Sequence, residues 1–229
     1  MPFIPRFKSL GFSGISYKII SWWRGLNIKK AKEKKSILFV CCGNRERSVI
    51  AERLLRQKLI DDFPGLAEKV QIGSAGIIPR QYLRHAEAKG ITFQYPHFSK
   101  NPNVYALQYL AKKGINVSSY RSRELTKDMV MEADLILAID RLIKGEVLYF
   151  YVETSDKVFT VKEFVFGDSL QNLDIGDPMK LPDIDEETGA WIWPEGYPDS
   201  YIAEIEQCLS HGIDKFVQYI KGRVLIREA

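Results

Sequence analysis

Short apolar runs alternate with segments of helical periodicity along most of the chain. Four runs are apolar and rich in β-branched residues, as buried strands are, and they lie at residues 36–40, 69–76, 134–140 and 157–164, the last of which includes the start of the next turn. Apolar residues recur at helical spacing in residues 49–59, 104–113, 126–133, 141–150 and 199–221. Strands that alternate with helices in this order form a doubly wound sheet. We therefore predict an α/β fold with a four-stranded parallel sheet and helices on both faces.

The length of the chain fits one such domain with additions. Its 229 residues are 45% hydrophobic and 27% charged, which is ordinary for a globular protein. We assign residues 36–229 to the domain and residues 1–35 to a basic N-terminal extension. No apolar run approaches the ~20 residues that a transmembrane helix needs.

The N-terminal extension carries the positive charge of the chain. The formal net charge is +4 overall and +8 for residues 1–35, which leaves −4 for the rest. Ile15, Ile19 and Trp23 could form one apolar side of a helix, and a basic run follows at 29–35. Such a helix would suit peripheral contact with an anionic membrane, but we favour an additional packed helix or a disordered arm. Because the domain itself is not basic, we expect no nucleic-acid partner.

The junction between the first strand and the first helix carries the candidate chemistry. Residues 41–48 are Cys-Cys-Gly-Asn-Arg-Glu-Arg-Ser. A strand-to-helix turn directs backbone N–H groups and the positive end of the helix at what it holds, so it forms an anion site. This position near a guanidinium favours the thiolate form of Cys41, and Arg47 offers a planar fork for two oxygens of one phosphate. A nucleophile beside an oxyanion site predicts phosphoryl transfer.

The wider pattern V-C-x-G-N-x-x-R-S-x-x-A-E, from Val40 to Glu52, resembles the low-molecular-weight protein tyrosine phosphatase family. The resemblance extends over about residues 36–222 and implies a phosphotyrosine phosphatase I-like fold, in which residues 74–76 (Ser-Ala-Gly) border the pocket. Relative to the family, about residues 77–103 and 179–198 are insertions. The phosphate-binding loop that the resemblance implies consists of Cys42, Gly43, Asn44, Arg45, Glu46, Arg47 and Ser48.

The general acid that the resemblance implies is Asp177, which precedes Pro178 late in the chain. Asp174 is its near competitor, and Asp199 is a weaker one. The family usually has an aromatic residue after this proline, where this chain has Met179. The second insertion either supplies the missing aromatic wall or is a surface loop.

In the implied reaction the Cys41 thiolate attacks phosphorus, Arg47 and the N–H groups of the loop hold the equatorial oxygens, and Asp177 protonates the leaving oxygen. No metal or cofactor is required. Two residues depart from the family: Arg45 replaces a small or apolar residue that faces the substrate, and Glu46 stands where members often carry a second cysteine. We expect Glu46 to pair with Arg45 or a neighbour, or to act on Cys41 through like charge.

We predict a cysteine-dependent protein tyrosine phosphatase whose partner is a phosphorylated protein. A phosphoarginine phosphatase is an alternative, because Arg45 lies where leaving-group preference is set. Two others are an arsenate reductase, which relays oxidation through further cysteines, and a catalytically weak phosphopeptide-binding protein. The chain has three cysteines, too few for a secreted disulfide scaffold, and a thiolate nucleophile needs a reducing compartment, which favours the cytoplasm.

Overall fold

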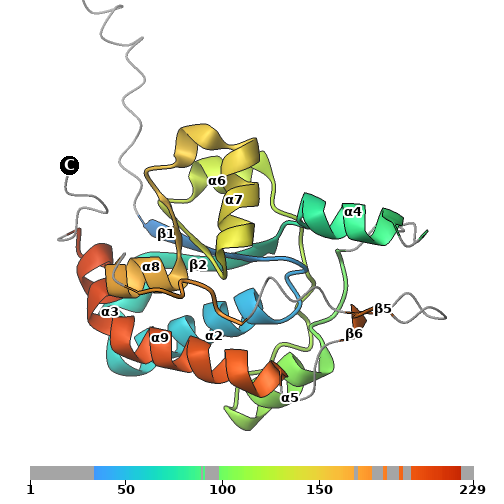
Figure 1. The fold of residues 1–229 in the computed structure, drawn as a ribbon. Helices are drawn as coiled ribbons and strands as arrows, with labels where there is room; N and C mark the ends of the chain where they lie inside the picture. Colours follow the sequence, from blue (N-terminus) through green and yellow to red (C-terminus); the bar gives the residue numbers. More distant parts are fainter. Residues whose placement is uncertain are drawn as a thin grey trace, which may run out of the picture. The chain divides into compact units, whose positions relative to one another are not determined.

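Four parallel strands form the main sheet of the protein, which is shown as a computed structural model in Figure 1. The structure describes residues 34–88, 90, 98–167, 170–176, 183–184, 191–192 and 197–222. The strands are β1 (Lys35–Cys41), β2 (Val70–Gly76), β3 (Leu135–Ala138) and β4 (Val158–Thr160). Their order in the sheet is β2-β1-β3-β4, and all pairs are parallel. The predicted four-stranded parallel sheet is confirmed.

Strand β1 lies inside the sheet, between β2 and β3. Ile37 and Phe39 belong to one cluster of buried hydrophobic residues, and Leu38 and Val40 belong to a second cluster on the opposite face. A strand that is covered on both faces can be apolar at successive positions, which explains why this run does not alternate with polar residues. The sheet therefore has a core on each side.

Helices cover both faces of the sheet. In the described part of the chain they are α2 (Arg47–Asp62), α3 (Pro64–Ala67), α4 (Arg80–Ala88), α5 (Val104–Lys112), α6 (Lys127–Glu132), α7 (Arg141–Phe150), α8 (Val161–Phe166) and α9 (Tyr197–Ile220), with a short 3-10 helix at Val152–Thr154. Helices α2, α5, α8 and α9 contribute to the larger core, and α6 and α7 to the smaller one (Figure 1). Both faces are thus covered, as the alternating pattern predicts.

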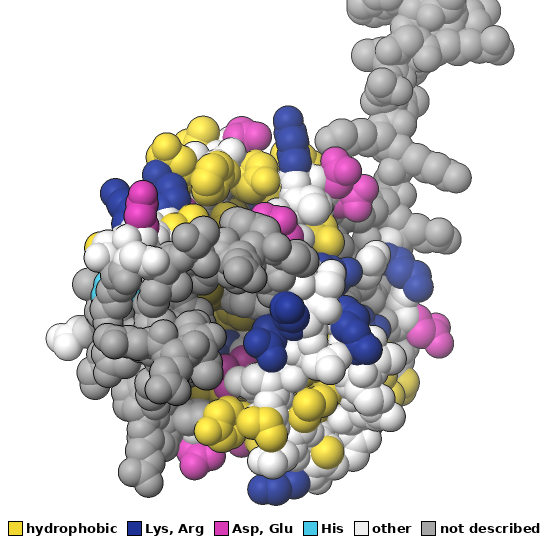
Figure 2. Space-filling model, turned by 90° about the vertical axis from the view of Figure 1, so that its right-hand side faces the viewer, with side chains coloured by type: hydrophobic (Ala, Val, Ile, Leu, Met, Phe, Trp, Pro, Cys, Tyr) yellow, Lys and Arg dark blue, Asp and Glu magenta, His cyan; other side chains and the backbone are white. Residues whose placement is uncertain are grey.

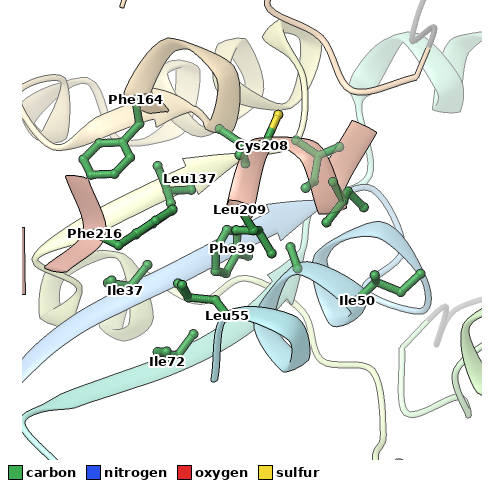
Figure 3. Close-up of a cluster of buried hydrophobic side chains, with 14 of the residues drawn as sticks. Ile37, Phe39, Ile50, Leu55, Ile72, Leu137, Phe164, Cys208, Leu209 and Phe216 are labelled. Carbon is green, nitrogen blue, oxygen red and sulfur yellow. The ribbon is translucent and has the colours of Figure 1, made fainter. Parts of the chain in front are cut away.

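The larger core connects the sheet to α2 and α9. Figure 3 shows Phe39 of β1 and Leu137 of β3 lying among Leu55 of α2, Leu209 of α9 and Phe216 of α9. Phe39, Leu55 and Phe216 are fully buried. Each such side chain stabilises the fold by about 1.5–3 kcal/mol relative to an exposed one. This packing fixes α2, and with it the loop that enters α2.

The fourth apolar run contains a strand and the start of a helix. β4 ends at Thr160, and residues 161–164, where the sequence predicts the start of the next turn, begin helix α8. The side chain of Thr160 accepts a hydrogen bond from the backbone of Glu163, and the Glu163 side chain accepts one from the backbone of Thr160. This reciprocal capping box starts a helix in a run whose composition is typical of a strand.

The additions to the domain are described only in part. The first insertion contains α4, and its residues 89 and 91–97 lie outside the described residues. In the second insertion, β5 (Asp183–Ile184) pairs with β6 (Trp191–Ile192) in an antiparallel ladder. Residues 1–33 of the N-terminal extension also lie outside the described residues. Within the described helices, none combines the length and the apolar character that crossing a bilayer requires.

Candidate active site

The candidate nucleophile Cys41 is the last residue of β1, at the edge where the parallel strands end. Its side chain is buried, and its Sγ lies 2.9 Å from the Oγ of Ser48 in the first turn of α2. The loop of residues 42–46 connects these two positions. Ligand sites of open α/β sheets lie at this edge. The Ser48 hydroxyl is therefore within hydrogen-bond distance of the Cys41 sulfur.

Asn44 holds the shape of the loop. Its backbone has a φ of 51°, which lies in the left-handed region. Its amide nitrogen donates to Ser48 Oγ at 3.1 Å and to Ser74 Oγ at 2.9 Å. Its carbonyl oxygen accepts from the Tyr120 hydroxyl at 2.6 Å and from the backbone N–H of Arg123 at 2.9 Å. A fully buried side chain with four such bonds fixes the turn in one conformation.

The network around Asn44 continues to a buried carboxylate. The Ser74 hydroxyl donates to Glu52 Oε2 at 2.6 Å, and the Tyr120 hydroxyl lies 2.9 Å from Ser74 Oγ. The negative charge of Glu52 is compensated by two ion pairs. Its Oε1 lies 3.6 Å from the guanidinium of Arg53 and 3.8 Å from that of Arg56. Burial raises the pKa of Tyr120 to about 12, so its hydroxyl stays protonated and can donate to the loop. The sequence analysis missed Glu52 and Tyr120 in this role.

Gly76 lets the backbone of β2 approach the loop closely. A Cβ atom at this position would lie 2.7 Å from the backbone oxygen of Cys42 and 2.9 Å from the backbone nitrogen of Asn44. Both separations are shorter than real Cβ contacts. Any larger residue at Gly76 would therefore displace the phosphate-binding loop.

Arg47 is held by a carboxylate that our site assignment missed. Its guanidinium donates to Asp140 Oδ2 at 3.0 Å and to the backbone oxygen of Ile175 at 3.2 Å. Both charged side chains are buried, so the pair is little screened by water. Asp140 also accepts from the backbone N–H of Ile143 at 2.7 Å and so caps α7. The sequence feature that could have identified Asp140 is its position directly after a buried apolar run, at the strand ends where the site lies.

Glu46 has a different partner from the ones we considered. Its carboxylate accepts a hydrogen bond from the hydroxyl of Tyr201, which is fully buried on α9. Glu46 is the N-cap residue of α2, but its side chain makes no capping hydrogen bond. Of the alternatives considered, a pair between Glu46 and Arg45 is not among the described contacts. The carboxylate is turned toward α9 instead.

Arg45 lies at the exposed edge of the loop. Its Nε donates to the backbone oxygen of Asn101 at 2.8 Å, and its own backbone oxygen accepts from the N–H of Asn103 at 2.9 Å. Asn103 in turn caps α5 through its side chain. The loop is thus connected to residues from the first insertion, which the family resemblance alone does not predict.

The predicted general acid Asp177 lies outside the described residues. Its near competitor, Asp174, is buried and accepts from the backbone N–H of Arg141 at 2.7 Å. The guanidinium of Arg141 also donates to both carboxylate oxygens of Asp174. A carboxylate occupied in this way is poorly suited to deliver a proton. Asp199 is exposed in the first turn of α9.

Cys42 and Cys41 differ in their surroundings, although they are adjacent. Burial, reinforced by the neighbouring Cys41, raises the pKa of the Cys42 thiol well above its ordinary value. Cys42 is therefore protonated at neutral pH and contributes through its backbone rather than as a nucleophile. No three His, Cys, Asp or Glu side chains of the described ranges gather as a metal-binding group.

The arrangement supplies what displacement at a phosphate needs. A buried sulfur lies beside a hydroxyl at the start of a helix, and a buried guanidinium is held in place one residue before that hydroxyl. Helix N-termini bind phosphate through backbone N–H groups, and a planar guanidinium adds two directed donors. The fold and the site together define a class of enzymes that transfer a phosphoryl group through a cysteine.

Comparison with known proteins identifies the family. The model of the low molecular weight phosphotyrosine protein phosphatase family matches residues 36–188. A probable low molecular weight protein-tyrosine-phosphatase, EpsP, from Ralstonia nicotianae is 34% identical over 146 residues, which cover 64% of this chain and 79% of that protein. The protein belongs to the low molecular weight phosphotyrosine protein phosphatase family, whose members are cysteine-dependent hydrolases.

Other relatives of the chain act on a different phosphorylated residue. A protein-arginine-phosphatase from Geobacillus stearothermophilus is 32% identical over 146 residues, covering 64% of this chain and 80% of that protein. The solved structure of YwlE arginine phosphatase from the same organism has a TM-score of 0.57 and 27% identity, over 81% of this chain and 94% of that one. The solved structure of a low molecular weight protein tyrosine phosphatase from T. tengcongensis has a TM-score of 0.56 and 26% identity, over 80% of this chain and 99% of that one.

Proposed function

We propose that the protein hydrolyses phosphotyrosine in proteins through a phosphocysteine intermediate on Cys41. The observation that carries the proposal is the pair of contacts that flank the loop. Cys41 Sγ lies 2.9 Å from Ser48 Oγ, and Arg47 is held 3.0 Å from Asp140. The nucleophile and the phosphate-binding guanidinium are thus both buried and both held by side chains before substrate arrives.

In the first step the Cys41 sulfur forms a bond to phosphorus, and the bond from phosphorus to the tyrosine oxygen breaks. The guanidinium of Arg47 and the backbone N–H groups of residues 42–48 hold the three equatorial oxygens, over which charge is spread. Asp177 gives its proton to the departing tyrosine oxygen, so that the leaving group is a neutral phenol.

In the second step a water molecule attacks the phosphocysteine. Asp177, now ionised, takes a proton from the water as its oxygen bonds to phosphorus. The sulfur–phosphorus bond breaks, and the products are inorganic phosphate and the Cys41 thiolate. Ser48 supports this step, because its hydroxyl can donate to the departing sulfur at 2.9 Å.

Arg45 supports tyrosine rather than arginine as the preferred phosphorylated residue. Its guanidinium is held at the exposed edge of the loop by the backbone oxygen of Asn101. The leaving group of phosphoarginine is itself a guanidinium, and two like charges at one edge repel each other. A phenol carries no such charge. Similarity to the protein-arginine-phosphatases supports phosphoarginine as the second candidate.

The cysteines weigh against arsenate reduction. Only Cys42 and Cys208 could relay oxidation from Cys41, since the chain has no other cysteine. Cys208 lies in the core on α9, as Figure 3 shows, and burial raises its pKa to about 11. A disulfide between the adjacent Cys41 and Cys42 would be strained. A phosphopeptide-binding protein without turnover remains the non-enzymatic alternative for the experiment below.

Location and further partners belong to the same proposal. We place the protein in the cytoplasm, where thiols stay reduced, and we expect no nucleic-acid partner. Residues 1–35 carry a net charge of +8 and are a candidate for contact with anionic lipid. Binding of the full chain to anionic vesicles that weakens with added salt would support this contact, and binding that is absent or insensitive to salt would contradict it.

The test of the proposed function is turnover of para-nitrophenyl phosphate by the wild type and two cysteine variants. We expect a burst of nitrophenol in the wild type, complete loss of turnover in Cys41→Ser, and retained turnover in Cys208→Ala as the matched control. Peptides that carry phosphotyrosine or phosphoarginine then separate the two substrates by their kcat/KM. Tight phosphopeptide binding without turnover by the wild type would contradict an enzymatic role.

A further inference from the structure

Four cationic residues lie in the phosphate-binding loop or in segments whose backbone is connected to it. Arg45 belongs to the loop, and hydrogen bonds connect it to the backbone of Asn101 and Asn103. The preceding residue, Lys100, is connected to Ser122, which accepts a hydrogen bond from the backbone N–H of Lys100 on its Oγ and donates its own N–H to the Lys100 oxygen at 2.8 Å. These contacts bring the backbone of Lys100 and of the two neighbours of Ser122 to the same edge of the site, and the guanidinium of Arg123 lies against Ser74 and Gly73 of β2. We refer to Arg45, Lys100, Arg121 and Arg123 as the basic rim.

The charges of the basic rim are exposed and are not neutralised by carboxylates. Arg45, Lys100, Arg121 and Arg123 are all exposed. Arg121 donates to the backbone oxygens of Ser118 and Tyr120, at 3.0 and 2.8 Å. Arg45 and Arg123 likewise donate to backbone oxygens. Among the described residues, none of the four takes part in an ion pair.

Acidic residues are few in the segments that carry the basic rim. Residues 98–103 and 116–123 contain no Asp or Glu, and the exposed Glu124, which follows Arg123, forms no ion pair among the described residues. The one carboxylate of the loop, Glu46, is turned away to Tyr201. Figure 2 shows the face at which the strands end, and dark blue Lys and Arg side chains gather near its middle. The net charge of the chain outside residues 1–35 is −4, so this local excess of positive charge is not a property of the whole domain.

We propose that the basic rim binds acidic residues that flank the phosphorylated residue of the substrate. The inference rests on the proposed function, because the loop would hold the phosphate while the rim holds the chain on either side of it. Backbone hydrogen bonds fix the arginines without cancelling their charge, so they remain available to carboxylates. An acidic phosphoprotein segment is the chemistry that four uncompensated cations beside a phosphate site recognise.

The rim should act on substrate capture rather than on the chemical step. Its side chains are exposed, and interactions between exposed charges are screened by salt and fall off over a Debye length. Such contacts are made equally in the ground state and the transition state, so they lower KM and leave kcat unchanged. This separates the role of the rim from that of Arg47.

The experiment uses two phosphotyrosine peptides that differ only in having Glu or Gln at the positions beside the phosphotyrosine. At about 20 mM salt we expect the wild type to favour the Glu peptide by about tenfold in kcat/KM, and at about 0.5 M salt we expect that preference to disappear. Lys100→Glu and Arg121→Glu should each lower kcat/KM for the Glu peptide by about fivefold through KM. Hydrolysis of para-nitrophenyl phosphate, which has no flanking residues, should not change.

The matched control is Lys69→Glu, which makes the same change in net charge at an exposed lysine just before β2, at the opposite edge of the sheet. Equal kcat/KM for the two peptides at low salt would overturn the inference, as would an equal effect of Lys69→Glu. If the wild type hydrolyses neither peptide, the proposed function fails. Binding of both peptides to the protein would then still test the rim, and equal affinities would overturn it.

Discussion

The two halves of the phosphate-binding loop are held in different ways. In the first half, Asn44 forms hydrogen bonds with neutral groups of the loop itself, of β2 and of the segment around Tyr120. In the second half, the charged side chains of Glu46 and Arg47 are bound by Tyr201 and Asp140. These two partners come from α9 and from the turn between β3 and α7.

The difference shows that shape and charge are separate requirements of the site. The neutral bonds of Asn44 keep the backbone in a turn that includes a φ of 51°. The contacts of the second half keep a guanidinium and a carboxylate pointing in fixed directions, and the buried pair of Arg47 and Asp140 does so in a poorly solvated place. We therefore expect substitutions in the two halves to differ in their effects on catalysis and on the free energy of unfolding.

Replacing Asp140 should have the largest effect. Asp140→Asn keeps an oxygen that can cap α7, but it removes the charge that holds Arg47. We expect kcat/KM to fall about 100-fold, because a misplaced guanidinium no longer fits the transition state. We also expect the free energy of unfolding to fall by about 3 kcal/mol, since a buried charge loses its partner. Steady-state kinetics and urea unfolding measure the two effects.

The control for this variant is Asp174→Asn. It removes the charge of a carboxylate that forms an ion pair with the exposed Arg141 on the same side of the site. It should lower stability without a comparable loss of kcat. If Asp140→Asn retains wild-type kcat/KM, then the ion pair does not orient Arg47 and the distinction between the two halves is lost.

Replacing Asn44 should affect shape first. Asn44→Ala removes the side-chain hydrogen bonds and leaves a non-glycine residue in the left-handed conformation, which costs about 1–2 kcal/mol of strain. Asn44→Gly removes the same bonds without the strain. We expect a roughly tenfold loss of kcat in both variants, with Asn44→Ala about 1 kcal/mol less stable than Asn44→Gly. Equal stability of the two would show that the loop does not require the left-handed turn.

Removing the hydroxyl of Tyr201 should have a moderate effect. Tyr201→Phe keeps the buried ring and leaves the Glu46 carboxylate without its donor on α9. We expect a loss of about 1 kcal/mol in the free energy of unfolding. A double-mutant cycle with Glu46→Gln measures the coupling, and additive effects of the two substitutions would contradict a direct bond between them.

The smallest expected effect is on the pH dependence of stability in the variant Tyr120→Phe. Burial raises the pKa of Tyr120 to about 12 in the folded protein, from an ordinary value near 10. A raised pKa means that the folded state favours the protonated form of Tyr120. The stability that the protonated hydroxyl contributes is therefore fully present below about pH 10 and is lost as the pH rises toward 12. Unfolding measured between these values should show a shallower decline for Tyr120→Phe than for the wild type. An identical decline would place Tyr120 outside the network around Asn44.

Much of the fold follows from local patterns. The runs that predicted β1, β2 and β3 are apolar because their strands are buried, and the helical spacing after residue 47 predicted α2. The run at 157–164 predicts the fourth strand and the start of the next turn, but it does not place the boundary between them, because apolar residues lie on both sides of Thr160. There the capping box of Thr160 and Glu163 decided the structure.

By itself the sequence determined the chemistry of the loop and its turn. Cys41, Asn44, Arg47 and Ser48 lie within eight residues, and a strand followed by a helix fixes their relative positions through the backbone. Only the tertiary structure decided what holds them. Asp140 contacts Arg47 across 93 residues, Tyr201 contacts Glu46 across 155, and Tyr120 contacts Asn44 across 76. No local periodicity encodes such pairs, because they depend on which strand ends and helices the packed core brings to the same edge of the sheet.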